Sequence, residues 1–206
     1  MNFLSFNIRG IGGAEKPGWL KKVKSDFGIH FLSLHETKKQ GVSVLDVSGY
    51  WGNKSFSLES VDAEGLSGGL VCMWDKSVFS QTGVNRNRNF LHVRGKLSGS
   101  SEVVNVLNVC AHQGVSAKKS LWDMISQLIA EHDGFWIVSG DFNAVRYSEE
   151  KKNCGFKQNC ANNFNSFIFD SGLLEYNLIG RKFTYSKENG RKMSKLDRFL
   201  VNHSFF

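Results

Sequence analysis

Carboxylate and amide side chains stand directly after several apolar segments that are expected to form buried strands. Asn7 follows FLSF, Glu36 lies in LSLHETK, and Asp141 and Asn143 follow the segment WIVSG. A single residue of this kind is more often a loop cap or a turn residue. Layered folds, however, can gather the ends of distant strands at one edge. The joint occurrence of four such residues therefore favours a shared site.

This set of residue types suits the hydrolysis of a phosphodiester bond. A hard divalent cation prefers carboxylate oxygens and water, and Glu36 is the candidate ligand. Asp141 can orient or deprotonate the attacking water, and Asn7 and Asn143 can hold phosphate oxygens without adding negative charge. The cation is expected to be Mg²⁺, with Mn²⁺ as the alternative.

Further motifs occur in a specific order along the chain: FNIRG, HETK, SGGL at 67–70, NVCA, GDFN at 140–143 and LDRF at 196–199. In this order they resemble the endonuclease/exonuclease/phosphatase (DNase I-like) superfamily, over nearly all of residues 1–206. The segment GRKFTYSKENGRKMSKLDRFLV resembles most the endonuclease domain of plant LINE-type non-LTR retrotransposons. The resemblance implies an α/β fold, a four-layer α/β sandwich.

The resemblance also implies residue roles and partners. Glu36 would bind the metal, Asn7 the phosphate or the metal, and Asp141 the attacking water, while Asn143 would support the transition state. Asp197 of LDRF would help to orient a histidine, and Asn108 of NVCA would contact the substrate. The resemblance implies DNA as partner, and a nuclear location and a reverse transcriptase in the parent element follow from the resemblance alone.

Four departures from the superfamily pattern bear on activity. Arg9 stands where related sequences have an acid, Cys110 stands in place of a phosphate-contacting tyrosine, and His112 replaces a proline. The Ser-Asp-His segment expected after LDRF has no counterpart before Phe206. We therefore expect a C-terminally truncated domain that lacks its last core strand, with impaired activity unless His112 or His203 compensates.

The composition limits the classes of protein to which the chain can belong. With 206 residues, 41% hydrophobic, the chain suits one domain with a sizeable core, and a monomer is expected. Its net charge of +7 suits a polyanionic partner. No apolar run approaches the roughly 18 residues of a membrane span, so no membrane partner is expected. The four cysteines show no metal-ligand spacing and are expected to be reduced thiols.

Apolar patterning predicts several strands and helices. The helices are expected around Trp19 to Phe27, after a capping Ser116, and around Phe164 to Ile168. An Asn-Gly signal at 189–190 predicts a hairpin. The strands are expected at 3–8, 29–34, 68–74, 90–97, 103–111, 135–139, 182–187 and 193–201.

The segment NRNRN at 85–89 is expected to form a cationic loop whose Arg86 and Arg88 contact phosphate. Three functions remain open at this point. The first is a DNA endonuclease of a retroelement, and the second is a phosphatase or RNase of the same superfamily. The third is an inactive retroelement remnant or a nucleic-acid-binding module.

Overall fold

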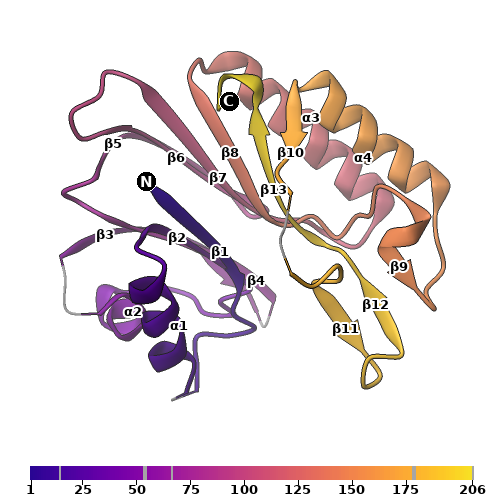
Figure 1. Cartoon of the computed structure of the whole chain (residues 1–206), viewed down its shortest axis with the longest axis horizontal. Helices are drawn as coiled ribbons and strands as arrows, with labels where there is room; N and C mark the ends of the chain where they lie inside the picture. Colours follow the sequence, from indigo (N-terminus) through magenta and orange to yellow (C-terminus); the bar gives the residue numbers. More distant parts are fainter. Residues whose placement is uncertain (14, 53–54, 66, 178–179, 206) are drawn as a thin grey trace.

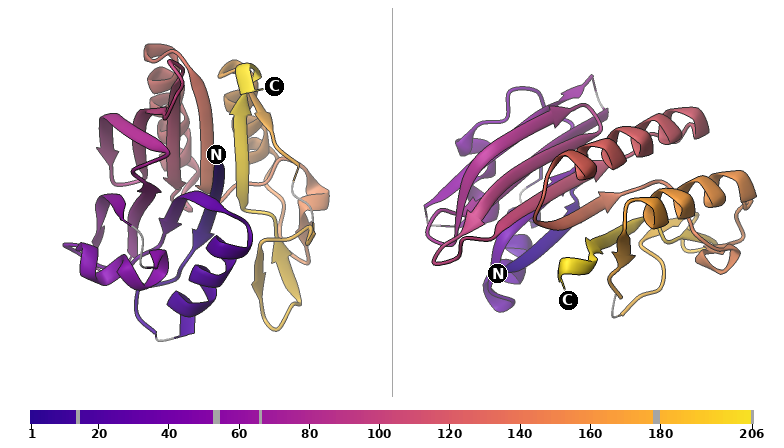
Figure 2. Two further views of the ribbon diagram at one scale, coloured as in Figure 1. Left: turned by 60° about the vertical axis from the view of Figure 1, so that its left-hand side comes forward. Right: turned by 90° about the horizontal axis from the view of Figure 1, so that it is seen from above.

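Two β-sheets packed face to face, with helices on both outer surfaces, make up the molecule (Figures 1 and 2). The computed structural model describes residues 1–13, 15–52, 55–65, 67–177 and 180–205. In the first sheet the strands are ordered β1-β2-β4-β3, and in the second β10-β13-β8-β7-β6-β5. A small third sheet, β11-β12-β9, projects from the second (Figure 1).

The first sheet contains β1 (Asn2–Asn7), β2 (Ile29–His35), β3 (Phe56–Glu64) and β4 (Ser67–Asp75). The second contains β5 (Phe79–Asn87), β6 (Phe90–Leu97), β7 (Val103–Cys110), β8 (Phe135–Asp141), β10 (Leu173–Glu175) and β13 (Asp197–Asn202). The third contains β9 (Lys151–Lys152), β11 (Tyr185–Lys187) and β12 (Lys192–Ser194). The helices are α1 (Glu15–Asp26), α2 (Val44–Trp51), α3 (Val115–Glu131) and α4 (Gln158–Asp170), with short 3-10 turns at Ser148–Glu150 and His203–Phe205.

Three apolar clusters separate the four layers. Strand β2 shows how one element serves two of them, because its side chains alternate between its faces. Leu32 and Leu34 pack beneath α1 and α2 against Leu20 and Trp51, whereas Phe31 packs between the sheets. A third cluster, which contains Trp122 of α3 and Phe164 of α4 among others, covers the outer face of the second sheet. The expected four-layer α/β sandwich is therefore confirmed.

Most of the strands and helices predicted from the sequence are present, with several differences. Helix α3 is capped at Gly114, so the capping role predicted for Ser116 is wrong. The predicted strand 193–201 divides into β12 and β13, which belong to different sheets. The expected loop at 85–89 is instead the end of strand β5 and the turn into β6, because its backbone pairs with β6 and Arg86 is ion-paired with Glu59 of β3. Helix α2 and strands β3 and β5 were not predicted, since they are short or polar on one face.

Gly140 in GDFN has a backbone requirement that the sequence motif does not reveal. Its φ is 134°, and an added Cβ would lie 2.0 Å from the carbonyl oxygen of Val109 on the neighbouring strand β7. We expect Gly140→Ala to lower the free energy of unfolding by more than about 4 kcal/mol. The matched control is Gly99→Ala, since Gly99 also has a positive φ, 79°, but no atom within 4 Å of an added Cβ. That control should cost only about 1 kcal/mol. Equal losses in urea unfolding would contradict the steric explanation.

Candidate active site

The chemistry-bearing residues come together at one end of the two sheets. Asn7 ends β1 and Glu36 directly follows β2, its parallel neighbour. In the facing sheet, Asp141 ends β8 and is the register partner of Asp197, the first residue of β13. Parallel pairing of β1 with β2, and antiparallel pairing of β8 with β13, thus brings residues from four distant segments to the same edge.

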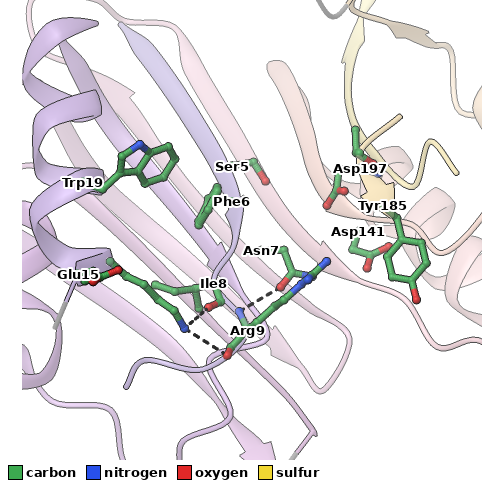
Figure 3. Close-up of a pocket in the computed structure, with 12 residues that line it drawn as sticks. Ser5, Phe6, Asn7, Ile8, Arg9, Glu15, Trp19, Asp141, Tyr185 and Asp197 are labelled. Carbon is green, nitrogen blue, oxygen red and sulfur yellow. Dashed lines mark hydrogen bonds between the residues drawn. The ribbon is translucent and has the colours of Figure 1, made fainter. Parts of the chain in front are cut away.

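Two adjoining hollows hold these side chains. The larger, about 730 Å³, is lined by Asn7, Asp141 and Asp197 together with Tyr185 of the projecting hairpin (Figure 3). A second hollow of about 380 Å³ is lined by Asn7, Glu36, Asp141 and Asn143. Because Asn7 and Asp141 line both, the two hollows form a single open cleft, and we refer to it as the carboxylate cleft.

The backbone around the carboxylate cleft is strained. Arg9, Glu36 and Asn143 have φ values of 48°, 58° and 46°, in the left-handed region that non-glycine residues seldom adopt. Such conformations persist only where the surroundings fix them, and they gather at functional sites. Each of the three follows the end of a strand that borders the cleft, where a sharp change in chain direction turns the side chains toward it.

Hydrogen bonds hold these turns in place. Asn7 Oδ1 accepts the backbone N–H of Arg9 at 3.1 Å, and Asp141 Oδ1 accepts the N–H of Asn143 at 2.8 Å. The Lys16 Nζ donates to the carbonyl oxygens of Ile8 and Gly10, both at 3.0 Å. The loop after β1 is therefore fixed by a side chain from α1.

Lys118 supports the other turn from α3. Its side chain is buried, and its Nζ donates to the carbonyl oxygen of Asn143 at 2.8 Å. The Asn143 side chain in turn donates to the carbonyl oxygen of Ala111 at 2.7 Å. Neither Lys16 nor Lys118 was singled out from the sequence, because a lysine that binds backbone carbonyls has no motif of its own.

Three carboxylates, those of Glu36, Asp141 and Asp197, act on one another electrostatically in the cleft. Burial raises the pKa of Asp141 to about 6, and the neighbouring charges of Asp197 and Glu36 add to this increase. Burial likewise raises the pKa of the Cys110 thiol to about 12, with Asp141, Glu36 and Asp197 contributing. The thiol therefore remains protonated at neutral pH and is a poor nucleophile.

The cleft fits a hard dication that keeps most of its water. Among the residues that the structure describes, no three His, Cys, Asp or Glu side chains are grouped so as to hold an ion by themselves. Mg²⁺, however, commonly uses one or two carboxylates with water and substrate phosphate oxygens. Glu36 and Asp141 supply carboxylate oxygens to the same hollow.

The three residues expected to contact substrate lie in different surroundings. Asn108 is fully buried, and its amide donates to the carbonyl oxygens of Leu34 and Val71, so in this conformation it joins the sheets. Arg86 is ion-paired with Glu59 of β3. Arg88 is ion-paired with Glu64 at 2.8 Å, and it borders a further hollow that also contains Glu36.

His35, which precedes the candidate metal ligand, was not singled out from the sequence. Its side chain is only 1% exposed, and its Nε2 lies 3.1 Å from Oδ1 of Asp197. Strand alternation predicts that His35 lies on the same face of β2 as Phe31. It does not predict what His35 meets, because Asp197 lies 162 positions away.

No protein-family model and no curated protein sequence matches the chain. Solved structures do. An AP endonuclease from Leishmania major has a TM-score of 0.75 at 14% identity, covering 98% of this chain and 78% of that one. A 3′ phosphatase from Neisseria, bound to product DNA hairpin, has a TM-score of 0.70 at 15% identity, with coverages of 99% and 87%. The fold is thus that of the DNase I-like endonucleases, exonucleases and phosphatases.

A retrotransposon domain shares this fold. The endonuclease domain of TRAS1, a telomere-specific non-LTR retrotransposon, has a TM-score of 0.67 at 12% identity, covering 98% of this chain and 85% of that domain. At such identities the likeness concerns the fold. Within the described residues, no helix is both long enough and apolar enough to cross a membrane.

The electrostatics of Asp141 predict a gain in stability when the charge is removed. Its pKa is raised from 3.8 to about 6 in the fold. The contribution of the Asp141 carboxyl group to the stability of the fold is therefore greatest below pH 3.8. This contribution is lost as the pH rises through about 6. In EDTA at pH 8, we expect the free energy of unfolding of Asp141→Asn to be up to about 3 kcal/mol higher than that of the wild type. The amide oxygen can still accept the N–H of Asn143.

Urea unfolding of both proteins across pH checks this expectation, and the difference should vanish near pH 4. His92, whose pKa burial lowers to about 4, titrates in the same range but contributes equally to both proteins. A variant that is less stable than the wild type at pH 8 would contradict the expectation.

Proposed function

We propose that this chain is a metal-dependent phosphodiester hydrolase that nicks DNA, as the endonuclease of a LINE-type retroelement. The observation that carries the proposal is the carboxylate cleft: Asn7, Glu36, Asp141, Asn143 and Asp197 all border it. Had Glu36 and Asp141 been on opposite sides of the molecule, no single phosphate could have met both. The fold likeness to nucleases and to a retrotransposon endonuclease domain supports the proposal.

The chemistry of each residue in the cleft suits a different role in the reaction. Mg²⁺ bound near Glu36 would polarise the phosphoryl oxygen and offset charge that develops in the transition state. Asp141 takes the proton of the attacking water, a task suited by a pKa near neutrality. Asn7 Oδ1 already accepts the N–H of Arg9, so its Nδ2 is the group that donates to a phosphate oxygen. Asn143 uses one amide hydrogen on Ala111, which leaves the other for substrate.

Cationic side chains around the same cleft favour a polyanionic substrate. Arg9 lines both hollows, and Lys151 and Lys157 line the smaller one beside Glu36 and Asp141. Cations beside the reactive carboxylates can hold the phosphates that flank the bond to be cut. A substrate that extends beyond a single phosphate, such as a DNA strand, meets the cations and the reactive carboxylates at once. Action on chromosomal DNA would place the protein in the nucleus.

Nicking of supercoiled plasmid in Mg²⁺ tests the proposed function. We expect Glu36→Ala and Asp141→Asn each to reduce the rate by about 100-fold or more. Asp170→Asn is the control, because Asp170 is an exposed acid on α4 that borders none of these hollows. Cleavage of RNA or a phosphorylated inositol in preference to DNA would favour another hydrolase of this fold. An absence of turnover with Mg²⁺ and Mn²⁺ would favour a binding module.

The salt dependence of DNA binding tests the role of Arg9. We expect Arg9→Gln to weaken binding of duplex DNA and to make the slope of log K against log salt less steep by about 0.9, the value for one lost phosphate contact. Lys22→Ala is the control, since Lys22 is an exposed residue of α1 that pairs with Asp26 at 2.8 Å. Fluorescence anisotropy in EDTA gives the slopes. Identical slopes for wild type and Arg9→Gln would exclude the contact.

A further inference from the structure

A buried histidine links the two sheets at the carboxylate cleft. His35 ends β2 in the first sheet, in register with Asn7 of β1. Its Nε2 lies 3.1 Å from Oδ1 of Asp197, which begins β13 in the second sheet. A carboxylate oxygen can only accept, so the Nε2 of His35 is the donor and the proton lies on that nitrogen. One hydrogen bond thus connects the two halves of the cleft.

The histidine constrains how Asp197 can point. The Asp197 side chain is 31% exposed and lines the cleft beside Asp141, its register partner on β8. Two neighbouring carboxylates repel each other, so an unrestrained Asp197 would turn away from Asp141 toward solvent. The bond from His35 fixes one oxygen of Asp197 and leaves the other oxygen for the cleft.

Packing alone does not explain a histidine at this position. Its second ring nitrogen, Nδ1, is buried and has no hydrogen-bond partner within the described part of the chain. An unsatisfied buried polar atom costs about 1 to 3 kcal/mol. A leucine of similar size would fill the space between the sheets without that cost. What the imidazole adds is therefore its bond to Asp197.

We propose that His35 is a positioning residue, which holds Asp197 in the orientation that the cleft needs for cleavage. The inference rests on the proposed function for its catalytic consequence, and on the coordinates of His35 and Asp197 for its structural part. His35 itself does not touch substrate, because its side chain is closed off from solvent. Its effect on the reaction passes through Asp197.

Two substitutions separate positioning from packing. His35→Leu keeps the volume but removes the donor, whereas His35→Gln keeps a nitrogen donor at similar reach. We expect His35→Leu to lower kcat for plasmid nicking by about 10- to 100-fold, the scale of loss from small misplacements in an active site, with KM unchanged. Its thermal unfolding should occur no earlier than that of the wild type. His35→Gln should recover most of kcat.

A purely structural role predicts the opposite order, with Leu tolerated and Gln harmful, and that result would overturn the proposal. Ser33→Ala is the matched control, because Ser33 lies two residues earlier on β2, is also buried, and contacts Cys72 rather than Asp197. It should keep kcat within about twofold. In a double-mutant cycle, His35→Leu should have little further effect once Asp197 is Ala, because both changes remove the same interaction.

Nuclear magnetic resonance tests the hydrogen bond without using activity. In the metal-free wild type we expect a slowly exchanging Nε2–H signal from His35, and we expect Asp197→Ala to abolish its protection. Absence of that signal in the folded wild type would overturn the structural part of the inference. If the wild type cleaves no substrate with any divalent cation, the proposed function fails together with the catalytic role of His35, while the spectrum still decides whether His35 holds Asp197.

Discussion

The antiparallel pairing of β8 with β13 places two carboxylates side by side, and the rest of the site depends on that register. Asp141 and Asp197 are direct partners, and burial together with their mutual repulsion raises the pKa of Asp141 to about 6. Such a pair is unfavourable unless other interactions hold the strands in register. The next residue of β13, Arg198, supplies them: its fully buried side chain pairs with Glu150, and also with Glu175 at 2.6 Å.

The side chains of Asp197 and Arg198 in the LDRF motif thus point to opposite faces of the sheet. Asp197 faces the cleft between the sheets, while Arg198 lies over the ring of Phe164, on the side covered by α4. Breaking a buried ion pair leaves an uncompensated charge, so slippage of β13 by one residue would be costly. The ion pairs on the outer side therefore stabilise the arrangement that brings the acids together on the inner side.

The projecting hairpin is tied to the same strand. Thr184 Oγ1 accepts the backbone N–H groups of Leu196 and Asp197, at 2.9 and 3.0 Å. Lys195 pairs with Glu175 at 2.6 Å, which extends the buried network to the base of the hairpin. Tyr185, at the start of β11, lines both hollows of the carboxylate cleft. One wall of the cleft is therefore positioned by the contacts that fix Asp197.

Much of the fold could be predicted from the chain itself. Apolar segments located β1, β2, β4, β6, β7 and β8, because strands buried between sheets and helices carry the strongest pattern. Elements with one polar face, such as β3 and β5, gave no comparable pattern. The segment at 85–89 looked like a loop for the same reason, since its arginines are paired with acids of β3 that are distant in sequence.

The sequence by itself determined which residue types end the buried strands, and so which chemistry the molecule could support: Glu36, Asp141, Asn7 and Asn143. Tertiary structure decided their surroundings. It placed the Asn108 side chain in hydrogen bonds between the sheets, brought Lys118 beneath the turn at Asn143, and joined His35 to Asp197. Periodicity reports only on neighbours within a strand or helix, whereas each of these contacts joins segments that meet after the layers have packed.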